Sequence, residues 1–281
     1  MAIWSSLGKG ATQSCNNPVT GVNYLLEIRE ARASFPERGR LLKPQESIVE
    51  LRDTVALVTG GSEGIGRAIA EALTSEGSKV TITGRREDAV RSTAEELGLD
   101  WIVGDVGNEE DAVRTVGSVI EKHGRLDILV NNAGYGLFKP LVDTAFEELQ
   151  GVFSTNVFGA FLMAREAARQ FIKQSSGEMI NISSTSGLKG SAQRTAYGSS
   201  KFALRGMTDC WRDELRRHNV RVMLVNPSEV MTNFAEKAGV EREISDKKLR
   251  PREIADAIIG ALKVDRRAFI PEFSVFATNP F

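Results

Sequence analysis

Short apolar segments alternate with amphipathic segments from residue 54 almost to the end of the chain. The first apolar segment, residues 55–59 (VALVT), ends in glycines. In the segment that follows, residues 65–76, Ile65, Ala68 and Ile69 recur at helical spacing before Gly77. A short apolar run that ends in glycine is typical of a buried parallel strand, and apolar residues three and four apart are typical of a helix packed on a sheet. The pattern therefore predicts a strand followed by a helix.

The same alternation continues through the second half of the chain. Further strands are expected at residues 79–83, 100–104, 126–130, 178–182 and 221–225, with a last one near 269–270. Further helices are expected at residues 87–97, 109–123, 145–174 with an interruption near Gly151, 196–218, and from near Pro251. Strands that alternate with helices of this length predict an α/β, doubly wound (Rossmann) parallel sheet. We expect one domain over residues 51–281.

Residues 1–50 differ in character and are interpreted as an N-terminal extension. They are rich in Ser, Gly and Asn up to Gly21 and charged from there to Arg40. The first ten residues lack the continuous apolar core of a secretory signal, and Glu27, Glu30 and Glu37 argue against a transit peptide. A poorly ordered extension or an upstream-start artefact is favoured, and a partner-binding or targeting arm is the alternative.

Composition narrows the classes of partner. Lys+Arg 36 against Asp+Glu 37 gives a formal net charge of -1, so no global basic field would attract nucleic acid or anionic lipid. Cys15 and Cys210 provide neither a disulfide framework nor paired zinc-ligand spacing. No apolar run approaches the roughly 20 residues that span a bilayer. We expect a cytoplasmic protein with no metal, no membrane partner and no nucleic-acid partner.

A glycine-rich turn lies between the first expected strand and the first expected helix. The sequence TGGSEGIG, residues 59–66, has its glycines at the spacing G-x-x-x-G-x-G. Glycines there let the backbone approach a pyrophosphate, and the helix N-terminus supplies unpaired N–H groups. The candidate cofactor contacts are Gly60, Ser62, Gly64, Ile65 and Gly66. The alternative is a tight turn with no ligand.

The end of the second expected strand indicates which dinucleotide would bind. An acid there would hydrogen-bond a free ribose 2'-hydroxyl, but the sequence has Gly84-Arg85-Arg86. A guanidinium pairs well with a phosphate, so Arg85 favours NADP(H), although both arginines could simply solvate the next helix. Glu63 in the turn argues mildly against a nearby phosphate. Asp105 is a candidate for the adenine amino group, and a structural turn residue is the alternative.

Tyr197 and Lys201 are four residues apart and would share one face of a helix. An ammonium beside a phenol favours the phenolate, which makes the hydroxyl able to exchange a proton nearer neutrality. A Tyr-x-x-x-Lys spacing alone is also frequent by chance.

With these features in order, the chain from about residue 50 to its end resembles the short-chain dehydrogenase/reductase family. The motifs that carry the resemblance are the glycine turn, Asp105-Val106, Asn131-Asn132-Ala133-Gly134, Asn156, Ser184, Tyr197 with Lys201, and Asn226-Pro227 followed by Val230 and Thr232. Several motifs in the same order are much more specific than any one of them. At the level of individual enzymes the chain is similar to 3-oxoacyl-carrier-protein reductases, which share their motifs with many carbonyl reductases.

The resemblance implies a catalytic tetrad of Asn156, Ser184, Tyr197 and Lys201. Tyr197 would be the general acid in carbonyl reduction and Ser184 would hold the carbonyl oxygen. Lys201 would lower the Tyr pKa and bind the nicotinamide ribose, and Asn156 would support a water that links Lys201 to solvent. Local capping or turn bonding is the alternative for Asn156 and Ser184 taken singly.

The resemblance also implies further cofactor contacts at Asn132 and Thr232. Ser228 stands where the family usually has Gly, which puts the local backbone in doubt. Residues 233–250 would form a short, charged lid, so an open or polar pocket is favoured over a large apolar one. A solvated helix face is the alternative for most of these charges. Pocket walls are expected at Tyr135, Gly136, Leu137, Phe138 and Gln193.

The function predicted from these features is hydride transfer between NADP(H) and a carbonyl or secondary alcohol substrate. A non-catalytic sensor or scaffold on the same fold is the alternative, which intact Ser184, Tyr197 and Lys201 disfavour. The apolar tail, residues 269–281, is expected to pack at a subunit contact of a homo-oligomer, a dimer or tetramer.

Overall fold

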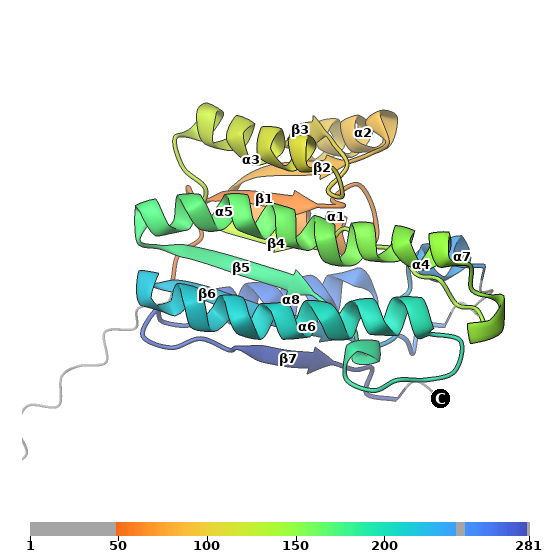
Figure 1. Cartoon of the computed structure of the whole chain (residues 1–281). Coiled ribbons are helices and arrows are strands. Elements are labelled where there is room, and N and C mark those ends of the chain that lie inside the picture. Colours follow the sequence, from red (N-terminus) through yellow and green to blue (C-terminus); the bar gives the residue numbers. More distant parts are fainter. Residues whose placement is uncertain (1–48, 240–244, 280–281) are drawn as a thin grey trace, which may run out of the picture. The chain divides into compact units, whose positions relative to one another are not determined.

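The computed structural model describes residues 49–239 and 245–279, and the expected N-terminal extension lies almost entirely outside these residues. The described part contains a seven-stranded sheet in the order β3-β2-β1-β4-β5-β6-β7, with every neighbouring pair parallel (Figure 1). Strand order reverses between β1 and β4, as in a doubly wound sheet. The predicted fold class is confirmed.

The strands and helices follow one another in the predicted alternation. The strands are β1 Val55–Thr59, β2 Lys79–Gly84, β3 Asp100–Val103, β4 Ile128–Asn131, β5 Gly177–Ile182, β6 Val220–Pro227 and β7 Glu272–Val275. The α-helices are α1 Gly64–Ser75, α2 Glu87–Leu97, α3 Glu109–His123, α4 Phe146–Phe153, α5 Ala160–Gln174, α6 Thr195–Leu215, α7 Phe234–Lys237 and α8 Pro251–Leu262. A π-helix, Ser154–Gly159, joins α4 to α5, and 3-10 turns occur at Leu141–Asp143, Thr185–Gly187 and Arg216–His218.

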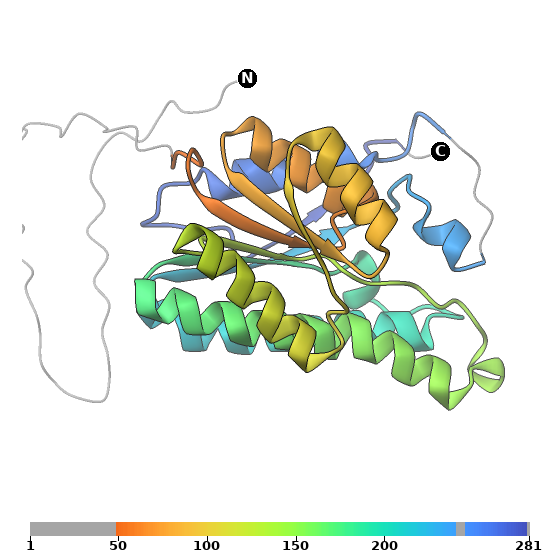
Figure 2. The same cartoon turned by 90° about the horizontal axis from the view of Figure 1, so that it is seen from above.

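Helices cover both faces of the sheet. Helices α3, α5 and α6 lie on one side, and α1, α2 and α8 lie on the other (Figure 2). Successive residues of β1 enter the two cores in turn: Leu57 packs in the cluster that contains Phe171 of α5, and Val58 packs in the cluster that contains Ile69 of α1. Because both faces are buried, the central strands β1 and β4 are mostly apolar, which is the pattern seen in the sequence.

Local signals set several helix ends. Asn108 caps α3, because its side-chain oxygen accepts a hydrogen bond from the backbone N–H of Asp111 at 3.0 Å. The left-handed Gly124, with φ of 74°, ends this helix. Pro251 opens α8, where the Glu253 carboxylate accepts from the backbone N–H of Arg250 at 2.6 Å. These caps explain why the predicted bounds 109–123 match and why α8 begins near Pro251.

Two expected boundaries are wrong. The last strand is β7, not residues 269–270, because Pro271 has no N–H and the paired register with β6 begins at Glu272. The long helical region is interrupted by the π-helix Ser154–Gly159 rather than at Gly151. The π-helix contains Asn156, whose side-chain hydrogen bonds are described below.

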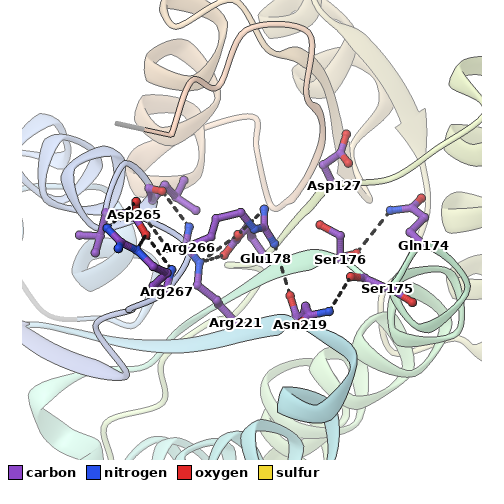
Figure 3. A network of polar contacts seen from close by, with 12 residues as sticks. Asp127, Gln174, Ser175, Ser176, Glu178, Asn219, Arg221, Asp265, Arg266 and Arg267 are labelled. Carbon is purple, nitrogen blue, oxygen red and sulfur yellow. Dashed lines mark hydrogen bonds and ion pairs between the residues drawn. The ribbon is translucent and has the colours of Figure 1, made fainter. Parts of the chain in front are cut away.

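A buried ion pair ties the strands together at the amino ends of β5 and β6. Glu178 and Arg221 are cross-strand partners, and Arg221 Nε lies 3.0 and 2.7 Å from the two carboxylate oxygens (Figure 3). The guanidinium also donates to the carbonyls of Leu262, Val264 and Ala268 at and after the end of α8, at 2.8, 2.8 and 3.2 Å. Burial raises the pKa of Glu178, and Arg221 opposes that shift. The pair holds β5, β6 and the end of α8 together at the amino ends of the strands, whereas the glycine turn lies at their carboxyl ends.

Candidate active site

A cavity of about 1090 Å³ lies at the carboxyl ends of the strands. Its wall includes residues that directly follow each of the six strands β1 to β6. Ligands of open α/β sheets bind at this edge, near the point where strand order reverses. The cavity is large enough for a dinucleotide together with a small substrate.

The glycine turn forms one end of the cavity and is tightly packed. Gly60 has a φ of 63°, and a Cβ there would lie 3.0 Å from the Cα of Ala133. A Cβ on Gly66 would overlap the carbonyl oxygen of Gly60 and the amide nitrogen of Asn132. Of the predicted contacts in the turn, Gly60, Ser62, Gly64 and Ile65 line the cavity. Gly66 does not line it, and its lack of a side chain instead lets α1 approach the turn.

The start of α1 fits an anionic group. Its N-cap residue, Glu63, makes no side-chain capping hydrogen bond, and the first turn contains no acid. Unpaired N–H groups at a helix N-terminus favour phosphate, so the turn and helix fit a pyrophosphate. Asn132 lines the cavity, and its side-chain amide donates to the carbonyls of Thr59 and Gly60 at 2.9 and 3.1 Å. Asn132 therefore holds the turn in shape.

Two arginines follow β2 at the rim of the cavity. Arg85 Nη1 lies 3.8 Å from Asp105 Oδ2, and Arg86 Nη2 lies 3.1 Å from Glu63 Oε1. Glu63 also forms an ion pair with Lys237 of α7, so its charge is shared between two cations. The objection that Glu63 would repel a phosphate is therefore weakened. Both guanidinium side chains are more than half exposed and accessible to a ligand.

Asp105 has a structural role in addition to its place in the cavity wall. Its Oδ1 accepts from the backbone N–H of Gly107 at 2.9 Å, and its own N–H donates to Asp111 Oδ2 at 2.8 Å. The turn-residue interpretation thus has direct support, and the second carboxylate oxygen faces Arg85.

Tyr197 and Lys201 lie one turn apart on α6, as their spacing predicted. Lys201 Nζ is 5.8 Å from the centroid of the Tyr197 ring and donates to the carbonyl of Ile182 at 2.8 Å. The lysine side chain is buried, and burial lowers its pKa to about 8. The phenol and the ammonium both line the cavity.

Asn156 lies in the π-helix and is fully enclosed. Its Oδ1 accepts from the N–H of Tyr135 at 3.0 Å, and its Nδ2 donates to the carbonyl of Tyr135 and to Ser200 Oγ, each at 3.0 Å. A Cβ on Gly134 would contact both Asn156 Oδ1 and Lys201 Nζ, so this glycine separates the two groups. Asn156 is near Lys201 but does not line the cavity. π-Helical turns frequently occur at functional sites.

Both serines of the Ser183-Ser184 pair line the cavity. Ser184 Oγ accepts from the N–H of Ser186 at 3.1 Å, which fixes the hydroxyl at the start of a 3-10 turn. Ser183 Oγ donates to the carbonyl of Lys201 at 3.4 Å. Ser183 therefore bonds to the helix that carries the tyrosine, while Ser184 is the hydroxyl that the family spacing selects.

The segment after β6 approaches the glycine turn from across the cavity. Thr232 Cγ2 would lie 3.3 Å from a Cβ on Gly64, and Thr232 Oγ1 accepts from the N–H of Phe234 at 3.3 Å. Ser228 does not have a positive φ, and its N–H donates to the carbonyl of Val275 at 2.9 Å. The departure from Gly at this position therefore causes no backbone strain.

The wall beside the phenol is aromatic, whereas the rest of the cavity lining includes many charged and polar side chains, as the expected open or polar pocket would. The ring of Tyr197 lies 5.6 Å from that of Phe138 and 5.4 Å from that of Phe234, centroid to centroid. Phe234 belongs to α7, and it was missed although it is the only aromatic residue within 233–250. Of the expected walls, Tyr135, Gly136 and Phe138 line the cavity. Leu137 and Gln193 do not, whereas Arg194, which sequence reasoning missed, does.

Within 49–239 and 245–279, no three His, Cys, Asp or Glu side chains are grouped so as to hold a metal ion. Across those two ranges there is also no helix with the length and apolar character needed to cross a membrane.

Comparison with known proteins agrees with this fold. The profile described as short chain dehydrogenase matches residues 54–243. The chain belongs to the short-chain dehydrogenase/reductase family of oxidoreductases.

Individual relatives extend over most of the chain. An uncharacterized oxidoreductase of Staphylococcus saprophyticus is 34% identical over 234 residues, which are 81% of this chain and 99% of the relative. An alcohol dehydrogenase from the archaeon Thermococcus sibiricus, complexed with 5-hydroxy-NADP, has a TM-score of 0.74 at 26% identity and covers 81% of this chain and 97% of its own. A metagenomic short-chain oxidoreductase in complex with NADP has a TM-score of 0.71 at 33% identity, covering 82% and 99%.

Proposed function

We propose that the protein transfers a hydride between NADP(H) and a carbonyl compound or secondary alcohol. The observation that carries the proposal is the pairing of the Tyr197 phenol with a buried Lys201 ammonium in the same cavity as the glycine turn. A sensor or scaffold would not require a buried cation beside a phenol. Burial of that cation is unfavourable, which makes a catalytic use the better explanation.

In the proposed mechanism Tyr197 is the general acid during reduction. A nicotinamide bound in the cavity would supply the hydride to the carbonyl carbon. Tyr197 donates its phenolic proton to the carbonyl oxygen, and the Ser184 hydroxyl donates a hydrogen bond to the same oxygen as negative charge develops. The Lys201 ammonium stabilises the phenolate left behind. In the oxidative direction the phenolate accepts the proton from the alcohol.

Asn156 is proposed to act by positioning. The hydrogen bonds from its side-chain amide to Tyr135 and Ser200 hold the π-helix against α6. In this position the π-helix would leave room near Lys201 for a water that returns protons to Tyr197 and Lys201. This role does not require the Asn156 side chain to enter the cavity.

The preference for NADP(H) rests on the charges after β2. The two residues directly after this strand are Arg85 and Arg86, not acids, and both line the cavity. The relatives in complex with NADP or its derivative support the same choice. Arg85→Asp is expected to weaken NADPH binding by 10-fold or more while changing NADH binding much less, because a guanidinium–phosphate pair is worth about 1.5–3 kcal/mol. Equal losses for the two cofactors, measured by fluorescence titration, would contradict the assignment.

The activity itself is tested by following NADPH consumption with a panel of ketones, aldehydes and 3-oxoacyl thioesters. Tyr197→Phe is expected to lower kcat at least 100-fold with every accepted carbonyl, since general acid catalysis contributes about 10²–10⁴-fold. Its binding of NADPH should persist, which separates loss of chemistry from loss of fold. A Tyr197→Phe variant as fast as the native protein would refute the mechanism.

A further inference from the structure

We propose that Arg194 binds an anionic group of the substrate, so that the substrate class is a carbonyl compound that carries a carboxylate on an apolar or aromatic body. The inference rests on the proposed function and specifies the substrate side of the same cavity.

Arg194 differs from the other arginines that line the cavity. Each of the others has a carboxylate partner within ion-pair distance: Arg67 with Glu96, Arg85 with Asp105, Arg86 with Glu63, Arg250 with Asp246 and Arg252 with Asp256. Among the residues that the structure describes, Arg194 forms no ion pair with a carboxylate, and Nη1 donates to the neutral Ser186 Oγ at 2.8 Å. A guanidinium has five N–H donors, so most of its capacity remains for a ligand.

The position of Arg194 is next to the proposed chemistry. It is the N-cap residue of α6, three residues before Tyr197. Its Cζ lies 4.9 Å from the centroid of the Phe138 ring, and that ring packs edge-on against Tyr197. One aromatic ring therefore separates the guanidinium from the phenol. A guanidinium stacked on a ring keeps its N–H groups in its own plane, where they can bind a carboxylate with two parallel hydrogen bonds.

The surroundings indicate the rest of the ligand. Phe138 and Phe234 form an apolar wall around the phenol, which suits an aromatic or hydrocarbon body. Arg194 is only partly buried, so its charge is retained without the full cost of desolvation. A substrate with its carbonyl at Tyr197 and its carboxylate at Arg194 would satisfy both ends.

A purely structural role for Arg194 makes a different prediction. Arg194 bonds to Ser186, whose N–H donates to Ser184 Oγ, so the arginine could act only by positioning Ser184. Loss of such support would slow the reduction of charged and neutral substrates in parallel. Direct recognition of a carboxylate would change the ratio between them.

The test uses the rigid isomers 2-, 3- and 4-formylbenzoate and their methyl esters as aldehyde substrates with NADPH. For at least one isomer the native protein should show a kcat/KM about 10- to 100-fold higher for the acid than for its ester, the range expected of a charge-assisted bidentate contact. Arg194→Gln should bring that ratio to about one. Arg252→Gln is the matched control, because Arg252 lines the same cavity but is paired with Asp256, and it should keep the ratio.

A ratio of one or less for all three isomers in the native protein, or an acid preference that survives Arg194→Gln, overturns the inference while leaving the proposed function intact. Absence of NADPH consumption both with these compounds and with the panel of ketones, aldehydes and 3-oxoacyl thioesters contradicts the proposed function instead. In that case, calorimetric titration of benzoate into NADP⁺-saturated protein decides the role of Arg194. Binding that Arg194→Gln abolishes supports it, and equal or absent binding in the two proteins refutes it.

Discussion

Replacement of Lys201 by Met should make the folded protein more stable near neutral pH. The lysine side chain is 5% exposed and hydrogen-bonds one carbonyl, that of Ile182. In the ranges 49–239 and 245–279 no carboxylate lies within ion-pair distance of it, and burial lowers its pKa from 10.5 to about 8. Met keeps the length of the side chain and removes the charge, so Lys201→Met isolates the cost of burying the ammonium.

The magnitude follows from the two pKa values. Above pH 10.5 the amine is neutral in both the folded and unfolded states, and burial of charge costs nothing. As the pH falls from 10.5 to about 8, the unfolded chain binds a proton that the folded protein does not, and stability is lost at about 1.4 kcal/mol per pH unit. Below about pH 8 the cost is constant at about 3 kcal/mol.

The assay is chemical denaturation of both proteins without nucleotide, between pH 6.5 and 10. The free energy of unfolding of Lys201→Met minus that of the native protein should rise by about 2 kcal/mol as the pH is lowered from 9.5 to 7. The lost hydrogen bond to Ile182 adds an offset that is independent of pH. Lys189→Met, which removes an exposed lysine, is the matched control and should show no such rise. A difference that is flat from pH 10 to pH 8, or that falls, would refute the reasoning.

Three further predictions concern packing and the buried ion pair. Gly66→Ala should weaken NADPH binding at least 10-fold in a fluorescence titration, because the new Cβ would overlap the carbonyl oxygen of Gly60. Gly117→Ala in α3 should stabilise the fold by about 0.5–1 kcal/mol, because no atom lies within 4 Å of the new Cβ and alanine favours the helix. Arg221→Met should lower the free energy of unfolding by about 3–5 kcal/mol in urea denaturation, because Glu178 is left buried without its cross-strand partner. A loss below 1 kcal/mol would contradict that role.

The parts of the structure that the sequence predicted are those set by local signals. Residues 87–97 and 109–123 match the observed helices, since each ends in a left-handed glycine. The glycine turn and the pair Tyr197 and Lys201 were recognisable because their spacing directly encodes a turn and a helix face. The order of motifs then identified the family without any knowledge of packing.

The parts that were missed depend on contacts between distant segments. Glu63 seemed to repel a phosphate because the sequence does not reveal that Arg86 and Lys237 neutralise it, and Lys237 is 174 residues away. Arg194 has no distinguishing signal in the sequence, and only the fold shows that its guanidinium lies over the Phe138 ring, which packs against Tyr197. Side-chain pairing of this kind has no periodic signature in the sequence.

The short helix α7 makes two contacts that the charged sequence of residues 233–250 does not reveal. Phe234, at its first position, packs against the Tyr197 ring, and Lys237, at its last, pairs with Glu63 in the glycine turn. One turn of helix thus contacts the proposed proton donor at one end and the proposed pyrophosphate site at the other. The Lys237 charge therefore bridges two walls of the cavity, and the single aromatic residue of the segment supplies the apolar surface beside the phenol. Because Phe234 and Lys237 lie on the same helical turn, a shift of the glycine turn would also move the aromatic surface beside Tyr197.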